Sequence, residues 1–303
     1  MRRPSPLPND LDATAFSTAE AKRLGVPRHR TRSNTLVSPF YGVRLDHRPS
    51  STLERATAYS HWMGPNQFFS HLTAAELLGM RLPEGFHAGD LHVSSTPPLR
   101  APRSQGVVGH QRSLLAPVIA EHGLQVSSPI DTWLSLGAFL TADELTVMGD
   151  GLVSRLRPAT DLPGLASAVA DTAGRRGHDF LSTALRQIRP NTDSARETLL
   201  RLLVVRSGFP EPEVNGVILN SFGAVIAHGD LVFRTYRTIL EYDGGHHRED
   251  ERQFDIDIDR LDQLMEDDWR VIRVNKNLMG RTATLVGKIE TALNRGGWRR
   301  PTK

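Results

Sequence analysis

The residues best suited to chemistry in this chain lie in one short stretch near the middle of its C-terminal third. The carboxylates Asp230, Glu241 and Asp243 occur there, followed by the pair His246 and His247. Carboxylates that converge can hold a hard cation such as Mg²⁺, which binds one or two of them together with phosphate and water. That arrangement is used to cleave phosphodiesters. The alternative is a solvated acidic strand face, since Asp and Glu are ordinarily exposed, although strands are depleted in Asp.

The spacing of these acids predicts a β-hairpin that brings them together. The segment from Thr238 to Asp243 is β-rich, so alternation puts Glu241 and Asp243 on one face. If the chain reverses through a two-residue loop, Asp230 faces Glu241 and His228 faces Asp243. All three acids then share one side of the sheet, with opposed side chains roughly 5 Å apart at Cβ.

Composition limits the class of protein and the kind of metal site. A chain of 303 residues predicts two or three domains, and its 39% hydrophobic content is typical of a globular protein. No run approaches the roughly 18 apolar residues of a membrane helix, and the N-terminus lacks a signal-peptide core, so we expect a cytoplasmic protein without membrane contact. Because the chain has no cysteine, oxygen and imidazole ligands remain, which favours Mg²⁺ or Mn²⁺ at the acidic cluster.

The first segment, residues 10–48, has a pattern typical of a winged helix-turn-helix. Ser17 can cap a helix that ends at Gly25, and a second helix then carries Arg28, Arg30 and Arg32. A short β-wing is expected after it. Arginine suits bidentate phosphate contact, so these three residues are candidates for DNA binding. The alternative is a small helical hairpin with an exposed basic face.

The second segment, residues 51–190, predicts several helices and two strands, Leu91 to Ser94 and Val107 to His110. It shows little obvious chemistry. His71 lies at a predicted helix start, where a histidine is more often structural. The linker from Pro190 to Asp193 then separates this region from the third segment.

The third segment, residues 194–295, predicts an α/β domain. Ser194 and Glu197 form a capping-box pattern ahead of an apolar helix. Three strands, a polar helix from Glu249 to Met265, a buried strand from Trp269 to Val274 and a final helix follow. This order predicts a mixed sheet flanked by helices.

Several motifs of the third segment agree with one known family. They are a helix with Glu197, G-D-L-V-F around Asp230, I-L-E-Y-D-G-x-x-H ending at His247, D-x-x-R from Asp257 to Arg260, and L-x-x-x-x-W-R-V-I-R-V from Leu264 to Val274. Together they resemble the bacterial domains related to the very-short-patch-repair (Vsr) endonuclease, within the PD-(D/E)xK nuclease superfamily.

This resemblance, which covers about 100 residues, implies a restriction-endonuclease-like core. In such a core Asp230 and Glu241 hold the metal, and Asp243, His246 and His247 lie at its margin. Glu197 would cap its helix or hold an outer-shell water.

The chain departs from the superfamily pattern at one position. The motif (D/E)-x-K places lysine where this chain has Asp243, as the related subfamily's own E-x-D-G does. His247, Arg260 or Lys276 could supply the missing positive charge. Arg260 is also a candidate for DNA contact, unless it pairs with a neighbouring aspartate.

The first two segments resemble the AbiEi-type antitoxin-like proteins, which carry an N-terminal winged helix-turn-helix. The matching stretches are A-K-R-L-G-V-P-R, F-Y-G-V-R, S-H-L-T-A-A-E-L-L-G from Ser70 and S-S-P-I-D-T-W from Ser127. We therefore expect a metal-dependent DNA endonuclease with a DNA-binding head, acting on double-stranded DNA. The alternative is a DNA-binding regulator or antitoxin-like protein whose nuclease-like domain is catalytically silent.

Overall fold

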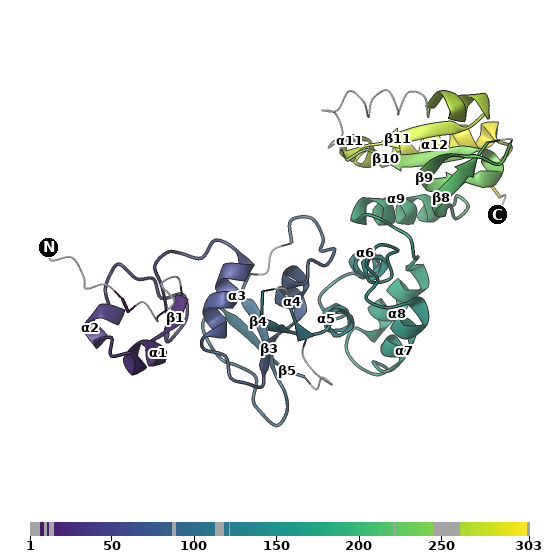
Figure 1. Ribbon diagram of the computed structural model, residues 1–303. Helices are drawn as coiled ribbons and strands as arrows, with labels where there is room; N and C mark the ends of the chain where they lie inside the picture. The colour runs from purple at the N-terminus through teal and green to yellow at the C-terminus, as the bar shows by residue number, and fades with distance from the viewer. Residues whose placement is uncertain are drawn as a thin grey trace. The chain divides into compact units, whose positions relative to one another are not determined.

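The chain is a mixed α/β protein whose elements fall into two compact units (Figure 1). The computed structural model describes residues 7–8, 11, 15–86, 89–112, 118–120, 122–220, 222–244 and 261–301. One unit comprises Met1–Leu140 with Asp171–His178, and the other comprises Thr141–Ala170 with Asp179–Lys303. No helix in the described ranges combines the length and apolar character needed to cross a bilayer.

The first unit begins with the predicted helical head. Its elements are β1 (Ala15–Ser17), α1 (Thr18–Arg23), α2 (Arg28–Thr31) and β2 (Val43–Leu45). As predicted, the Ser17 hydroxyl caps α1 by accepting the Glu20 N–H at 3.0 Å, and Gly25 ends the turn with a φ of 76°. The second helix is only four residues long. The predicted wing pairs with β1, a strand that the sequence pattern did not indicate.

The remainder of the first unit is a five-stranded sheet with helices. The elements are α3 (Thr52–Ser60), β3 (Gln67–Phe69), α4 (His71–Leu77), β4 (Leu91–Ser95), β5 (Val107–Gln111), β6 (Val118–Ile119), β7 (Gln125–Val126) and α5 (Pro129–Leu136). The strand order is β5-β4-β3-β7-β6. Leu91 and Val93 enter the core, so alternation turns His92 and Ser94 to the other face. The short strands β3, β6 and β7 were not predicted.

The second unit contains the predicted order of helix, three strands, helix, strand and helix. Its elements are α6 (Ala142–Leu152), α7 (Leu162–Ala170), α8 (His178–Gln187), α9 (Ala195–Arg206), β8 (Glu213–Leu219), β9 (Val225–Phe233), β10 (Thr238–Tyr242), a helical stretch at 261–266, β11 (Arg270–Val274), α11 (Lys276–Met279) and α12 (Thr282–Arg295). The sheet has the order β11-β10-β9-β8, with β10 and β11 parallel and the other pairs antiparallel. It is mixed, as predicted.

The two faces of this sheet have separate cores. Leu231, Leu240 and Val274 pack with residues of α9 and α12 on one face. Val232 and Ile239 pack with Leu264 of the helical stretch 261–266 on the other. Adjacent residues of β9 and β10 therefore face opposite layers, as strand geometry requires.

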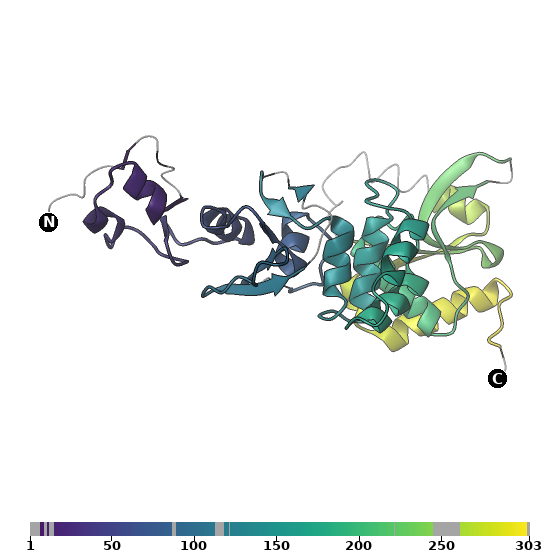
Figure 2. The same cartoon turned by 90° about the horizontal axis from the view of Figure 1, so that it is seen from below.

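The second unit starts earlier in the chain than residue 194, because α6 packs against α9 (Figures 1 and 2). Asp150 of α6 and Arg201 of α9 form a buried ion pair, with 3.1 Å between Oδ2 and Nη2. Thr198 donates a further hydrogen bond to Asp150 at 2.8 Å. The helices of residues 141–170 thus belong with this four-stranded sheet, although the sequence pattern grouped them with the middle segment.

Candidate functional site

The predicted register of the β9–β10 hairpin is confirmed. The paired residues are Thr238 with Phe233, Ile239 with Val232, and Leu240 with Leu231. The reversal itself is longer than the two-residue loop expected, because a 3₁₀ turn spans Arg234–Tyr236 and Arg237 adopts a left-handed conformation with φ of 44°. Asp230 would face Glu241 if this ladder continued by one more step.

The backbone pairing of β9 with β10 ends at Leu240. Beyond it, the Asp230 side chain, rather than its backbone, forms the next hydrogen bond to β10. Its Oδ2 accepts the main-chain N–H of Tyr242, with 2.6 Å between the two atoms. The carboxylate therefore lies beside β10, at the residue that follows Glu241. The predicted pairing of His228 with Asp243 is wrong, because the β9–β10 ladder ends at the pair Leu240 and Leu231. The Asp243 N–H is donated to the carbonyl of Val274 on β11 at 2.8 Å.

The regular alternation of side chains between the two faces of the sheet is interrupted in β9 at Asp230. Leu231 packs in the α9 and α12 core, yet a Cβ on Gly229 would meet Ile239 of the opposite core at 2.6 Å. Two residues that are two apart would share a face in a regular strand. Across the sheet, Asn215 has a φ of 47°. The irregularity at Asp230 could not be predicted from alternation, which assumes an unbroken ladder.

Glu197 stabilises this irregular position from α9. The helix N-terminus is capped as predicted, with the Glu197 N–H donated to the Ser194 hydroxyl at 3.2 Å. The buried Glu197 carboxylate also accepts the Asp193 N–H at 2.8 Å and the Asn215 side-chain amide at 3.1 Å. Since Asn215 lies between the two residues of β8 that pair with Leu231 and Gly229, Glu197 helps to hold the backbone opposite Asp230.

A positively charged side chain, Arg273, lies beside Glu241, and the sequence analysis did not predict it. Glu241 pairs with Arg273 of β11 in the parallel ladder, and paired residues project to the same side of a sheet. Glu241 is half-buried and Arg273 is exposed. The alternation in R-V-I-R-V could have indicated Arg273, because this strand presents an arginine between two apolar residues.

The other candidates for a positive charge are placed differently. Lys276 is exposed and begins α11, after the end of β11. His246, His247 and Arg260 lie outside the described residues. Asp243 is half-buried at the end of β10.

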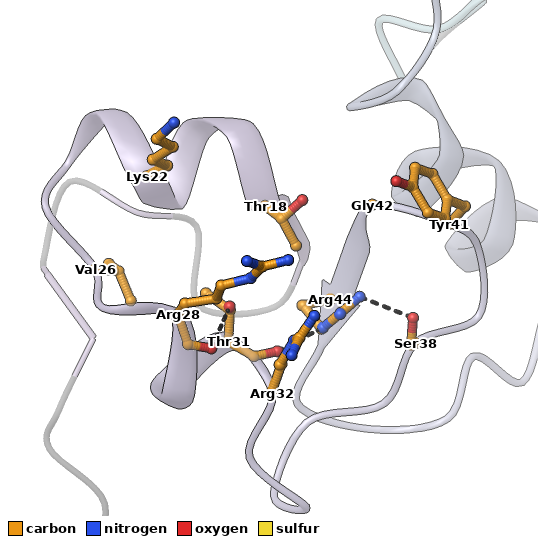
Figure 3. Close-up of a pocket in the computed structure, with 10 residues that line it drawn as sticks. All are labelled: Thr18, Lys22, Val26, Arg28, Thr31, Arg32, Ser38, Tyr41, Gly42 and Arg44. Atoms are coloured by element: carbon orange, nitrogen blue, oxygen red, sulfur yellow. Dashed lines mark hydrogen bonds between the residues drawn. The ribbon is translucent and has the colours of Figure 1, made fainter.

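A basic pocket lies in the helical head (Figure 3). It has a volume of about 690 Å³, and its lining includes Lys22, Arg28, Arg32 and Arg44. Figure 3 shows Arg32 and Arg44 close together, with Arg28 nearer α1. Four cations around one hollow repel one another unless an anion enters, so the pocket is suited to phosphate. Arg28 and Arg32 were predicted to bind DNA.

The remaining predicted arginine of the head, Arg30, does not line this pocket. Its guanidinium donates to the Thr35 hydroxyl at 3.2 Å. Arg44 instead has a positioning role, since it donates to the Thr31 carbonyl at 2.6 Å and to the Ser38 hydroxyl at 2.8 Å. Burial and the charge of Arg32 hold the pKa of Arg44 below its usual value.

A second group that sequence reasoning missed is made of His71, His92 and His110 in the first unit. Burial lowers the pKa of His71 to about 2 and that of His110 to about 4, and it also lowers the pKa of His92. The imidazoles are therefore neutral at physiological pH. The sequence signal was weak, because the three residues lie on separate elements that only the sheet brings together.

Comparison with known proteins gives one structural likeness. No protein-family model and no curated protein matches the chain. Among solved structures, it is similar to the crystal structure of the RV2827C protein from Mycobacterium tuberculosis, at 16% sequence identity and a TM-score of 0.36. The match covers 68% of this chain and 83% of that chain.

Proposed function

We propose that this chain is a metal-dependent DNA endonuclease, in which the second unit hydrolyses phosphodiesters and the helical head binds double-stranded DNA. The observation that supports this most directly is the position of the Asp230 carboxylate. It is held by the Tyr242 N–H at 2.6 Å, beside the strand that carries Glu241. Two acids thus come from neighbouring strands at the point where their pairing ends.

The residue types at this position suit a hard divalent cation. Asp230 and Glu241 offer carboxylate oxygens, and the main chain near Tyr242 offers another, which is the donor set that Mg²⁺ and Mn²⁺ prefer. An ion held by these residues would polarise the phosphodiester and lower the pKa of a bound water molecule.

The protein's own groups have distinct parts in this proposal. The hydrogen bond from Tyr242 orients Asp230 before substrate arrives, and Glu197 stabilises the strand irregularity through Asn215. Asp243 would orient the attacking water, and the guanidinium of Arg273 would offset negative charge on the phosphate in place of the absent motif lysine.

The order of elements also supports the proposal. A helix, three antiparallel strands, a helical stretch, a parallel strand and a helix agree with the restriction-endonuclease-like core that the resemblance to very-short-patch-repair endonucleases implies. Glu197, Asp230 and Glu241 then fall on the first helix, second strand and third strand of that core.

Plasmid cleavage tests the proposal. With Mg²⁺ or Mn²⁺, the full chain should convert supercoiled plasmid to nicked or linear forms, and EDTA should stop the conversion. Linear, mismatched and single-stranded substrates in parallel will identify the preferred DNA. Absence of cleavage on all four substrates, in both metals, would contradict an enzymatic role.

The basic pocket gives a separate prediction for DNA binding. The double change Arg28→Ala with Arg32→Ala should weaken binding of duplex DNA and reduce the slope of log affinity against log salt by about 2, one for each lost phosphate contact. Fluorescence anisotropy over a range of salt concentrations measures this slope. Arg48→Ala removes an exposed charge outside the pocket and is the control. An unchanged slope in the double variant would exclude the pocket from DNA contact.

The same pocket favours a second candidate function, a DNA-binding regulator of the antitoxin-like type. The positively charged side chains of the pocket need no metal to bind phosphate, and Asp243 occupies the position of lysine in the superfamily motif. A regulator should bind DNA equally well with EDTA or Mg²⁺ and should leave it intact. Calorimetric titration of Mg²⁺ separates the two candidates, because the nuclease site must take up the ion.

A further inference from the structure

Three histidines from three elements of the first unit meet on one side of its five-stranded sheet. His71 begins α4, His92 lies within β4 and His110 lies in β5. One ring nitrogen of each lies within 4.8 Å of those of the other two. His92 Nδ1 and His110 Nε2 are 3.0 Å apart, and the ring of His71 stacks on that of His110 with centroids 3.8 Å apart.

This arrangement costs the fold free energy. His71 has a left-handed backbone with φ of 50°, a conformation that is uncommon for residues other than glycine and that stores strain. His71 and His92 are also almost fully buried, at 4% and 7% exposure. Burying polar rings is unfavourable unless their nitrogens find partners. Here His92 Nδ1 and His110 Nε2 contact each other and His71 Nδ1 contacts Ser70, and a metal ion would replace the contact between the first two rings.

We propose that His71, His92 and His110 bind one transition-metal ion, with Zn²⁺ the expected ion. Two ligand nitrogens at zinc's usual bond length, in tetrahedral geometry, lie roughly 3.3 Å apart, close to the separation of the His92 and His110 nitrogens. The set contains imidazole only, which suits zinc and its transition-metal neighbours rather than Mg²⁺. Three protein ligands leave a fourth position for water or an anion.

The surroundings of the cluster resemble an outer shell that orients a ligand. The Ser70 hydroxyl is 2.9 Å from His71 Nδ1, and Ser94 donates to Ser70 at 2.7 Å. When His71 Nδ1–H donates to the Ser70 hydroxyl, the ring presents the lone pair of Nε2 to a metal.

Charge near the cluster determines the fourth ligand. Arg112 acts on both His71 and His110, and no carboxylate belongs to the three-residue set. The negative charge of Asp90, which acts on His92, favours a dication here, and the positive charge of Arg112 opposes it. The same charge favours an anion, such as hydroxide or phosphate, at the open position.

Cobalt titration of the full chain tests this proposal. After treatment with a chelator and its removal, one Co²⁺ per chain should produce the visible absorption of a tetrahedral site, and one Zn²⁺ should abolish it. His92→Gln and His110→Gln should each weaken binding of Co²⁺ by about 100-fold or more, since even loss of an outer-shell partner costs 10-fold to 100-fold. His110 is half-buried, so His110→Gln should disturb the fold less than His92→Gln does. It provides the test if His92→Gln does not fold.

Two controls keep this test separate from the nuclease proposal. His122→Ala removes an exposed histidine of the same unit, and Asp230→Asn alters the acidic site. Both variants should give the same tetrahedral Co²⁺ absorption as the unchanged chain. The proposal is overturned if the unchanged chain gives no tetrahedral absorption, or if His110→Gln binds Co²⁺ with unchanged affinity.

Discussion

Asp230→Asn should reduce the rate of Mg²⁺-dependent plasmid nicking by about 100-fold or more. Asparagine keeps an oxygen that can accept the Tyr242 N–H, but it removes the negative charge that a divalent cation requires. Loss of a residue that binds the metal directly should reduce activity by more than loss of an outer-shell partner, which typically reduces metal affinity or activity by about 10-fold to 100-fold. Glu241→Gln should have a similar effect. Conversion of supercoiled plasmid at fixed Mg²⁺ measures both.

The control for this prediction is Glu213→Gln. Glu213 is a carboxylate of the same sheet, exposed on β8 and paired with Arg234 at 2.6 Å, and its neutralisation should leave nicking unchanged. Circular dichroism should show the same fold in all three variants. Nicking by Asp230→Asn at the rate of the unchanged chain would refute the assignment of Asp230 to the metal.

The second large effect concerns stability. Asp150→Ala should lower the free energy of unfolding of the second unit by about 3–5 kcal/mol, because it removes the buried carboxylate beside the Arg201 guanidinium. The exposed Glu211, 3.6 Å from Arg201, would be the remaining carboxylate in contact with it. Arg201 is 1% exposed, and Asp150 also accepts the Arg189 N–H at 2.7 Å. Urea unfolding followed by tryptophan fluorescence measures the loss, since Trp269 and Trp298 lie in this unit.

Two further variants separate charge burial from helix packing. Asp143 and Arg206 also form an ion pair between α6 and α9, but both side chains are partly exposed. Asp143→Ala should therefore lower the free energy of unfolding by about 1 kcal/mol or less. Burial raises the pKa of Asp150 despite the nearby Arg201, which means that desolvation offsets much of the attraction. Combining Asp150→Ala with Arg201→Met should therefore recover part of the loss. Equal effects of Asp143→Ala and Asp150→Ala would contradict this reasoning.

Local patterns in the sequence predicted most of the second unit. Ser194 caps α9, the β9–β10 register follows the predicted pairing, and the buried strand and final helix lie where the apolar runs indicated. These features depend on contacts between residues that are close in the chain, so residue type and spacing are sufficient to indicate them. The same holds for the cap of α1 at Ser17.

Other features depended on residues far apart in the chain. The ladder between β9 and β10 ends at Leu240, the Asp230 carboxylate accepts the Tyr242 N–H, and Asn215 on the neighbouring strand donates to Glu197 of α9. A prediction from strand alternation assumes an unbroken strand, so it cannot indicate where pairing is interrupted. The packing of α6 on α9 likewise depends on Asp150 and Arg201, which no local pattern connects.

The sequence by itself determined the candidate acids, the absence of cysteine ligands, the arginines of the head and the order of elements in the second unit. Only the tertiary structure decided that Arg273 lies beside Glu241, that Arg28 and Arg32 but not Arg30 line the basic pocket, and that three distant histidines meet. The physical reason is that residue type and spacing set local hydrogen bonding and burial, whereas the convergence of side chains depends on long-range strand pairing and helix packing.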